Sequence, residues 1–306
     1  PQKGWYLIME KLEKPKKRFH FFKSKAGNRV NRSISGDVGI VIFLVFFAVI
    51  MAIPLYYAIV QSLKPLNELY IFPPRMYVTT PTMDNYADLF RLMSNSWVPF
   101  SRYVFNTVMI TVIGTFGHII LASMAAYPLA KYRFPGSVAF SHIVRFALMF
   151  NATVLTIPSY IIMAKLGWID TYLAVIVPAF GSSLGLYLMQ NFMADLHDAL
   201  FDAAKIDGAK EGTIFWKIVM PNVKSGWLTL MIFSVQSLWN TNNGMYIYSE
   251  PLKTMPYAIN QITSGGYARA GAASAGVVIM MLIPILVFVI SQSNVLETMQ
   301  KSGIKE

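Results

Sequence analysis

The sequence contains no cysteine and few charged side chains. The absence of Cys from its 306 residues excludes disulfides, thiolate metal sites and cysteine nucleophiles. Charged residues make up 13% and hydrophobic residues 55%, whereas soluble globular domains have about 25% and about 45–50%. A soluble fold cannot bury that much apolar surface, so the composition predicts a membrane protein.

Six runs are long and apolar enough to cross a bilayer, which takes roughly 20 residues. They are Val38–Val60, Tyr103–Ala130, Ser137–Ala164, Thr171–Met193, Gly226–Tyr248 and Gly271–Ser293. None alternates apolar and polar residues as a membrane β-barrel strand would. We therefore predict an all-α integral membrane protein with six transmembrane helices. The fifth run turns polar at Asn240–Gly244, which leaves open a shorter helix that ends near Trp239.

The distribution of basic residues predicts the orientation. Residues 1–36 hold ten of the 26 Lys and Arg side chains, and positive residues favour the cytoplasmic side. We expect a cytoplasmic basic tail at 1–36, a permease domain at 37–293 and a cytoplasmic tail at 294–306. The net charge of +11 then reflects topology and contact with anionic lipid, and no nucleic-acid partner is expected. Arg145, within the third run, should extend toward the cytoplasmic surface.

Acidic residues are missing from all six runs, which argues against ion-coupled secondary transport, because such transporters place carboxylates inside the membrane. His118 and His142 leave a histidine relay open, so a secondary transporter remains the alternative. Residues Gly181–Gly185 match a G-x-S-x-G nucleophile pattern, but they lie within a predicted span, where the two glycines would favour close helix packing.

The segment from 195 to 224 is long, mixed in charge and amphipathic. It predicts a short helix, a turn at Gly208, and a second helix from about Lys210 to Val219 that Pro221 ends. The apolar face of the second helix must pack against something, either the ends of the chain's own spans or a partner subunit.

The pattern within this segment resembles the signature loop of ABC-importer permease subunits. Within that family, the resemblance is to the carbohydrate permeases of the maltose-transporter type, and among these to the second of the two permease subunits. The matching residues are Asp202, Ala203, Ala204, Asp207, Gly208, Ala209, Phe215, Ile218 and Pro221. Asp202 stands for the usual Glu, and Met220 for a Leu. Ile157–Tyr160 and Leu166–Thr171 resemble the same family.

The resemblance implies a system of several subunits in a bacterial cytoplasmic membrane. A second homologous permease would pair with this chain, two ATPase subunits would bind beneath, and an extracytoplasmic sugar-binding protein would deliver a carbohydrate. Segment 195–224 would couple ATP hydrolysis to alternating access. The sequence has no G-x-x-x-x-G-K-[ST] loop, so we expect ATP and Mg²⁺ on the ATPase, and no enzymatic activity, cofactor or metal on this chain.

Polar side chains within or near the spans are candidates for a sugar path, because polar groups in hydrocarbon are costly unless they pair or line a wet passage. The candidates are Gln236, Trp239, Asn240, Asn243 and Asn151. In the alternative interpretation, Trp239 is an interfacial residue and Asn242-Asn243-Gly244 forms an outer turn.

Overall fold

The computed structural model describes residues 34–94, 98–150 and 152–303, and the regular structure in these residues is helical throughout. It divides into two compact units, residues 1–53 and 54–306. Helix α2 (Ile34–Leu63) passes through the boundary at Pro54. The basic tail at 1–36 lies almost wholly outside the described residues.

The second unit contains a series of helices, most of them joined by short loops. In chain order they are α3 (Leu66–Leu69), α4 (Asp84–Ser94), α5 (Phe100–Lys131), α6 (Ser137–Ala147), α7 (Ala152–Lys165), α8 (Leu173–Phe180), α9 (Ser183–Ala194), α10 (Asp198–Ile206), α11 (Glu211–Thr213), the π-helix η1 (Ile214–Val219), α12 (Met220–Asn222), α13 (Lys224–Trp239), the 3₁₀-helix η2 (Glu250–Leu252), α14 (Met255–Thr263), the 3₁₀-helix η3 (Tyr267–Arg269) and α15 (Ala270–Gly303).

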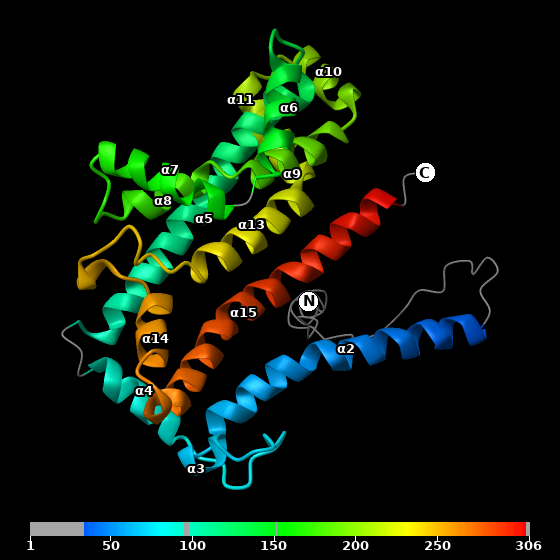
Figure 1. Cartoon of the computed structure of the whole chain (residues 1–306). Helices are drawn as coiled ribbons and strands as arrows, with labels where there is room; N and C mark the ends of the chain where they lie inside the picture. The colour runs from blue at the N-terminus through cyan, green and yellow to red at the C-terminus, as the bar shows by residue number, and fades with distance from the viewer. Residues whose placement is uncertain (1–33, 95–97, 151, 304–306) are drawn as a thin grey trace, which may run out of the picture. The chain divides into compact units, whose positions relative to one another are not determined.

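Helix α5 is the centre of this unit (Figure 1). It packs against α8, α9 and α13, while α13 also contacts α15. Small residues on α5 permit this close approach: a Cβ on Gly117 would lie 2.2 Å from the ring of Phe180 on α8. Helices in lipid gain their association energy from such close packing rather than from the hydrophobic effect.

Four helical stretches are long and apolar enough to cross a membrane: Gly36–Leu63, Phe100–Lys131, Leu173–Ala194 and Ala270–Gln292. The pair Glu211–Asn222 and Lys224–Trp239, bent by 77°, qualifies only as a broken span. The third apolar run forms two helices, α6 and α7, because the backbone after Ala147 tightens into i→i+3 turns at Met149 and Phe150. Six spans therefore stay a prediction.

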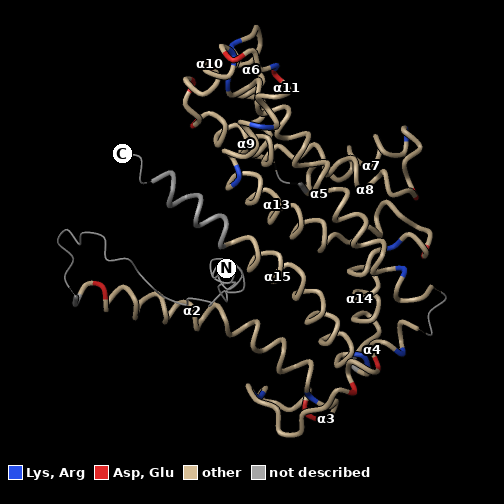
Figure 2. The backbone as a smooth tube through the Cα atoms, turned by 180° about the vertical axis from the view of Figure 1, so that it is seen from behind, with Lys and Arg blue, Asp and Glu red and all other residues tan. Residues whose placement is uncertain are grey.

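The fifth run ends as its shorter alternative predicted. Helix α13 stops at Trp239, and Asn240 caps it while its side-chain amide donates to the Gln236 carbonyl at 2.8 Å. Figure 2 shows charged residues near α10 and α11 and near α3 and α4, with none along the middle of α13. This separation of charge from apolar helix is what a bilayer requires.

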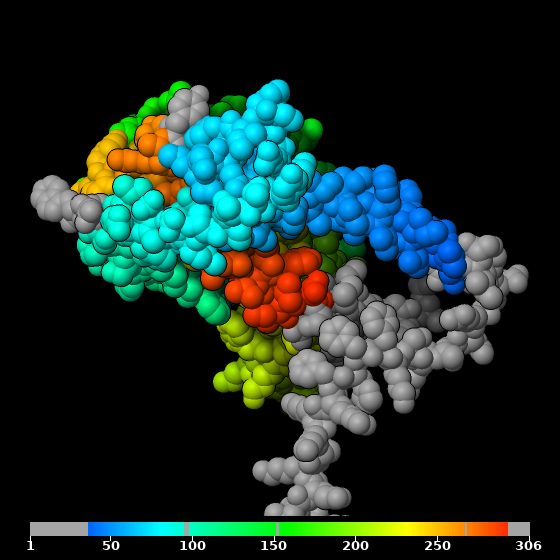
Figure 3. All heavy atoms as spheres, turned by 90° about the horizontal axis from the view of Figure 1, so that it is seen from below, coloured from blue at the N-terminus to red at the C-terminus, as the bar shows by residue number. Residues whose placement is uncertain are grey.

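The segment that follows α2 packs on the start of α15. Lys64 is buried and donates to the Arg75 carbonyl at 2.6 Å, and the Asn85 amide donates to the carbonyls of Ser62 and Lys64 at 2.8 and 2.7 Å. A Cβ on Gly271 would lie 2.0 Å from the Asn85 side-chain oxygen. Figure 3 shows the cyan atoms of this segment against the orange and red atoms of α15.

Candidate functional site

The first half of the signature loop (residues 195–224) is α10, which ends at a glycine turn. Gly208 has φ +74°, a left-handed conformation that glycine adopts without strain. The Ala209 N–H donates to the Ala204 carbonyl at 2.9 Å, and the Gly208 N–H to the Lys205 carbonyl at 3.0 Å. These two bonds form a Schellman motif, which satisfies the last carbonyls of the helix. The predicted helix and glycine turn are confirmed.

The second half is a bent continuation of helix from Glu211 to Asn222. Ile214, Phe215 and Val219 are buried and Ile218 is half-buried, so the predicted apolar face forms. The prediction that Pro221 ends this helix at once is wrong, since α12 extends to Asn222. The π-helix η1 directly precedes this turn. Its i→i+5 hydrogen bonds already replace the α-helical i→i+4 pattern, in which position 221 would have to donate a backbone N–H that proline lacks.

The buried face of the signature loop packs on the ends of α5 and α9. The Tyr127 ring on α5 lies 6.2 Å from that of Phe201 and 5.7 Å from that of Phe215, and Ala204 and Met193 join the same core. Burying an aromatic side chain of this size contributes about 1.5–3 kcal/mol. The loop is therefore a fixed extension of the helices beneath it.

Glu211 fastens the second half of the loop. Its carboxylate accepts a hydrogen bond from the Tyr127 hydroxyl at 2.9 Å and lies 3.6 Å from the Lys205 ammonium. Hydrogen bonding from Tyr132 and then from Tyr127 lowers the pKa of Glu211, and the charge of Lys205 lowers it further. The carboxylate is therefore held in its ionised form, in which it accepts these bonds.

Lys131, the last residue of α5, fastens the first half. Its ammonium forms a 2.9 Å ion pair with Asp198 and donates to the carbonyls of Ala194 and Leu196, at and just beyond the C-terminus of α9. A cation is favourable at the negative end of a helix dipole. The hydrogen bond and charge of Lys131 also lower the pKa of Asp198.

The opposite face of the signature loop points away from this core. Asp202, Ala203, Asp207 and Pro221 are exposed, Ala209 is half-buried, and Ile206 is 85% exposed. The loop therefore packs partly on its own helix ends, through Ala204 and Phe215. Its outer face, which carries both apolar and acidic side chains, has no cover in the part of the chain that the structure describes.

Of the predicted sugar-path residues, two belong to the packing of the chain. Trp239 is buried, and its indole N–H donates to the Met280 carbonyl on α15 at 2.9 Å. Asn243 is fully buried: its amide donates to the Leu252 carbonyl at 3.2 Å and its oxygen accepts from the backbone and hydroxyl of Thr254 at 3.1 and 3.2 Å. Asn151 lies outside the described residues.

The other two predicted residues, Gln236 and Asn240, line a groove of about 430 Å³ formed by α13, α14 and α15. Asn260 on α14 adds a third side-chain amide, and Met280 and Ile285 contribute to an apolar wall. The groove thus combines amide groups with apolar surface, the combination that a sugar's hydroxyls and ring faces require. The structure therefore divides the polar cluster that the sequence predicted at 239–243: Trp239 and Asn243 are buried, whereas Asn240 between them is exposed and lines the groove.

Asp170 is a positioning residue that the sequence prediction did not single out, although it belongs to the Leu166–Thr171 motif. Its φ of 62° is unusual for a residue with a side chain. Its carboxylate accepts from the backbone N–H groups of Tyr248 and Ser249 at 2.9 and 2.8 Å and from the Ser249 hydroxyl. Hydrogen bonds from Ser249, first from the hydroxyl and then from the backbone, lower the pKa of Asp170. Asp170 thereby ties the loop before α8 to the loop after α13.

The far end of α5 holds the same loop. The Asn106 amide donates to the carbonyls of Pro251 and Lys253, both at 2.8 Å, and the Thr107 hydroxyl accepts from the Met255 N–H at 2.8 Å. Helix α5 therefore contacts the signature loop at one end and the 250–255 segment at the other.

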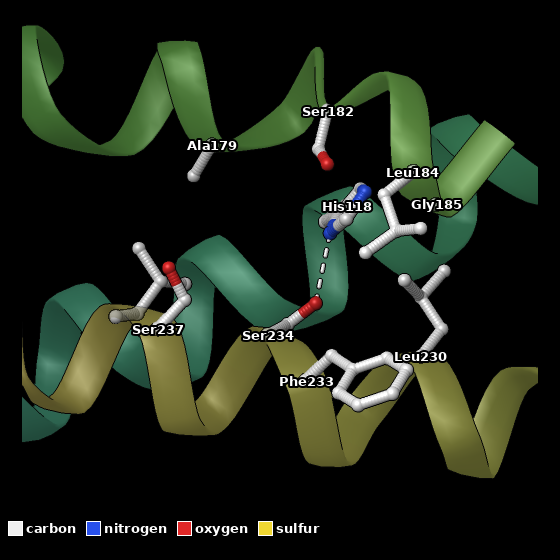
Figure 4. Close-up of a pocket in the computed structure, with 10 residues that line it drawn as sticks. His118, Ala179, Ser182, Leu184, Gly185, Leu230, Phe233, Ser234 and Ser237 are labelled. Atoms are coloured by element: carbon white, nitrogen blue, oxygen red, sulfur yellow. Dashed lines mark hydrogen bonds between the residues drawn. The ribbon is translucent and has the colours of Figure 1, made fainter. Parts of the chain in front are cut away.

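A small pocket of about 180 Å³ lies where α8 breaks from α9 (Figure 4). His118 on α5 is buried there, and its Nδ1 lies 2.8 Å from the Ser234 hydroxyl oxygen. Gly185 packs against the imidazole, as predicted for a close contact, whereas Gly181 caps α8 at the break. The serine at the nucleophile position of the G-x-S-x-G pattern is Ser183, and it is not among the residues that line this pocket, whereas Ser182 is.

Within the described residues, no group of three or more His, Cys, Asp or Glu is placed to hold a metal ion.

Comparisons with known proteins agree with this architecture. The arabinooligosaccharides transport system permease protein AraQ of Halalkalibacterium halodurans is 28% identical over 85% of this chain and 93% of its own length. Protein LplC of Bacillus subtilis is 32% identical over 67% of each chain. A chain of a solved bacterial ABC transporter involved in the import of the acidic polysaccharide alginate aligns with a TM-score of 0.72 and 22% identity, covering 86% of this chain and 99% of its own.

Residues 118–299 match the family described as the inner membrane component of binding-protein-dependent transport systems. This region contains the signature loop and most of the helices around α5. The resemblance to ABC-importer permeases is confirmed, as is the prediction of a membrane subunit rather than an enzyme. The chain belongs to the family of binding-protein-dependent transport system inner membrane components.

Proposed function

We propose that the chain is one of two permease subunits of an ATP-driven importer for a carbohydrate. The observation that carries the proposal is the signature loop, which is fixed to α5 and α9 on one face and exposes Ile206 and Ala203 on the other. The relative AraQ of Halalkalibacterium halodurans, named as an arabinooligosaccharides transport permease, supports the substrate class.

The exposed face of the signature loop binds a separate ATPase on the cytoplasmic side. ATP and Mg²⁺ bind that subunit, of which the system has two. A second homologous permease completes the path, and an extracytoplasmic binding protein delivers the sugar to the opposite side. The basic residues of 1–36 support this orientation, with both termini in the cytoplasm.

Helix α5 transmits the movement of the loop. Tyr127 and Lys131 hold the signature loop at its cytoplasmic end, and Asn106 and Thr107 hold segment 250–255 at the other. Because a helix resists bending, displacement of the loop by the ATPase moves both ends together, which is the requirement for alternating access.

The sugar passes along the groove of α13, α14 and α15. Gln236 and Asn240 donate and accept hydrogen bonds with its hydroxyls, since their side chains line the groove. Trp239 and Asn243 support this surface from within, through their bonds to Met280 and Thr254.

Reconstitution tests the function. The complete system in proteoliposomes should take up sugar only with ATP and loaded binding protein. Sugar uptake down an ion gradient by this chain without an ATPase would refute the proposal in favour of a secondary transporter.

Site-directed labelling tests the interface and the orientation. Because the chain has no native cysteine, Ile206→Cys supplies a single thiol that should cross-link to the ATPase and react with an impermeant maleimide only from the cytoplasmic side. Lys165→Cys is the matched control, expected to react only from outside. Labelling of both from one side would contradict the topology.

A further inference from the structure

A second polar cavity lies beside the signature loop and has no part in the proposed coupling. It measures about 420 Å³ and lies between the C-terminal end of α5, the first turns of α6 and the end of α9. Its polar lining includes Arg133, Ser137, Ser141 and Arg145, with Lys131 and Asp198 at one side. No other cavity described above brings three cationic side chains together.

The charges in this cavity do not balance. Lys131 and Asp198 neutralise each other across 2.9 Å. Among the residues that the structure describes, the acceptors of Arg145 are uncharged: the Ser141 carbonyl at 3.2 Å and the His142 ring nitrogen at 3.4 Å. Arg133 is exposed and makes no ion pair with any residue that the structure describes. Two guanidinium groups therefore face the cavity without a counterion in residues 34–94, 98–150 and 152–303.

Val138 is among the apolar side chains that line the cavity, and Phe134 and Phe146 belong to the same stretch of chain. Phe134, Val138 and Phe146 are 43%, 69% and 60% exposed, and they belong to the start of the third apolar run or directly precede it. Cationic groups next to exposed apolar side chains at the end of a span match the boundary between lipid headgroups and acyl chains.

We propose that this cavity binds the phosphate group of an anionic membrane lipid, with Arg133 and Arg145 as its ligands. A guanidinium presents paired N–H donors that suit phosphate oxygens. Phe134 and Val138 contact the acyl chains. The site rests on the proposed orientation, which places it in the cytoplasmic leaflet, where anionic lipid attracts basic residues.

Lipid binding to the purified transporter tests the site. Native mass spectrometry, with phosphatidylglycerol titrated against phosphatidylcholine, measures bound lipid independently of transport. Arg133→Gln combined with Arg145→Gln should weaken phosphatidylglycerol binding roughly 30-fold, equivalent to about 2 kcal/mol for two basic residues. The control, Lys210→Gln with Lys217→Gln, removes the same charge from the same end of the unit outside the cavity, and should leave binding unchanged.

Equal affinity in both double variants, or equal binding of phosphatidylcholine, would overturn the proposal. Inorganic phosphate separates lipid from a soluble anion: millimolar phosphate should not displace phosphatidylglycerol, and Val138→Ser should weaken lipid binding. Displacement by phosphate with no effect of Val138→Ser would make this a soluble-anion site and refute the lipid. Neither outcome depends on sugar uptake, so the site can fail while the importer function stands.

Discussion

The substitution Gly208→Val strains the turn of the signature loop without disturbing any neighbouring side chain. Gly208 has φ +74°, and a Cβ at this position would meet nothing within 4 Å. The cost is therefore conformational: the left-handed region costs an L-residue about 1–2 kcal/mol, and a β-branched side chain is at the upper end or above it. A cost of about 2 kcal/mol disfavours the native turn by roughly 30-fold.

We expect Gly208→Val to lower the amount of sugar moved per ATP hydrolysed, while membrane insertion is unchanged because the turn lies outside the apolar runs. The assay measures both rates in proteoliposomes with the complete system. Gly208→Asn is the matched control, since asparagine tolerates the left-handed conformation better than valine does. If the valine variant coupled as well as the asparagine variant, the turn's geometry would not matter for coupling and the reasoning would be refuted.

Three further outcomes follow from the packing. Trp239→Ala removes a buried indole and should lower the free energy of unfolding by about 3–5 kcal/mol, which a lower Tm would show. Asn240→Ala should instead leave the Tm unchanged and reduce sugar uptake. The reverse pattern would exclude Asn240 from the path. Glu211→Gln should lower the Tm at neutral pH. The pKa of Glu211 in the folded protein is lowered from its ordinary value of 4.5. The Tm difference between the two proteins should therefore disappear as the pH falls below 4.5 and through the folded pKa. A Tm difference independent of pH would contradict the role of the charge. Gly185→Ala places a methyl 2.1 Å from the His118 imidazole and should lower the free energy of unfolding by about 1–3 kcal/mol. Adding His118→Ala should restore part of the lost Tm. Strictly additive losses would argue against the contact.

The sequence predicted those features that depend on local chemistry. Gly208 was predicted to form the turn because only glycine adopts that backbone at little cost, and Phe215 to lie on an apolar face because of its helical spacing with Ile218. The apolar runs predicted α2, α5 and α15. The end of the second short helix was predicted wrongly from Pro221, because the effect of a proline depends on the register of the turn before it.

The predicted sugar-path residues show what local sequence patterns do not predict. Trp239, Asn240 and Asn243 lie close together in the sequence and looked alike as polar groups at the end of a span. Their environments differ because α13 ends at Trp239, and α15 and segment 250–255 then cover one side of it. No local property distinguishes an amide that faces a groove from one whose bonds are satisfied by a loop 11 residues further on.

The sequence by itself determined that this is a helical membrane subunit with a signature loop and no ATPase motif, because hydropathy and glycine conformation act over a few neighbouring residues. Only the tertiary structure decided which face of that loop is buried, how α5 links it to segment 250–255 through Tyr127 and Asn106, and that Arg133 and Arg145 share a cavity. These features depend on contacts between residues distant in the chain, and such contacts exist only once the helices pack.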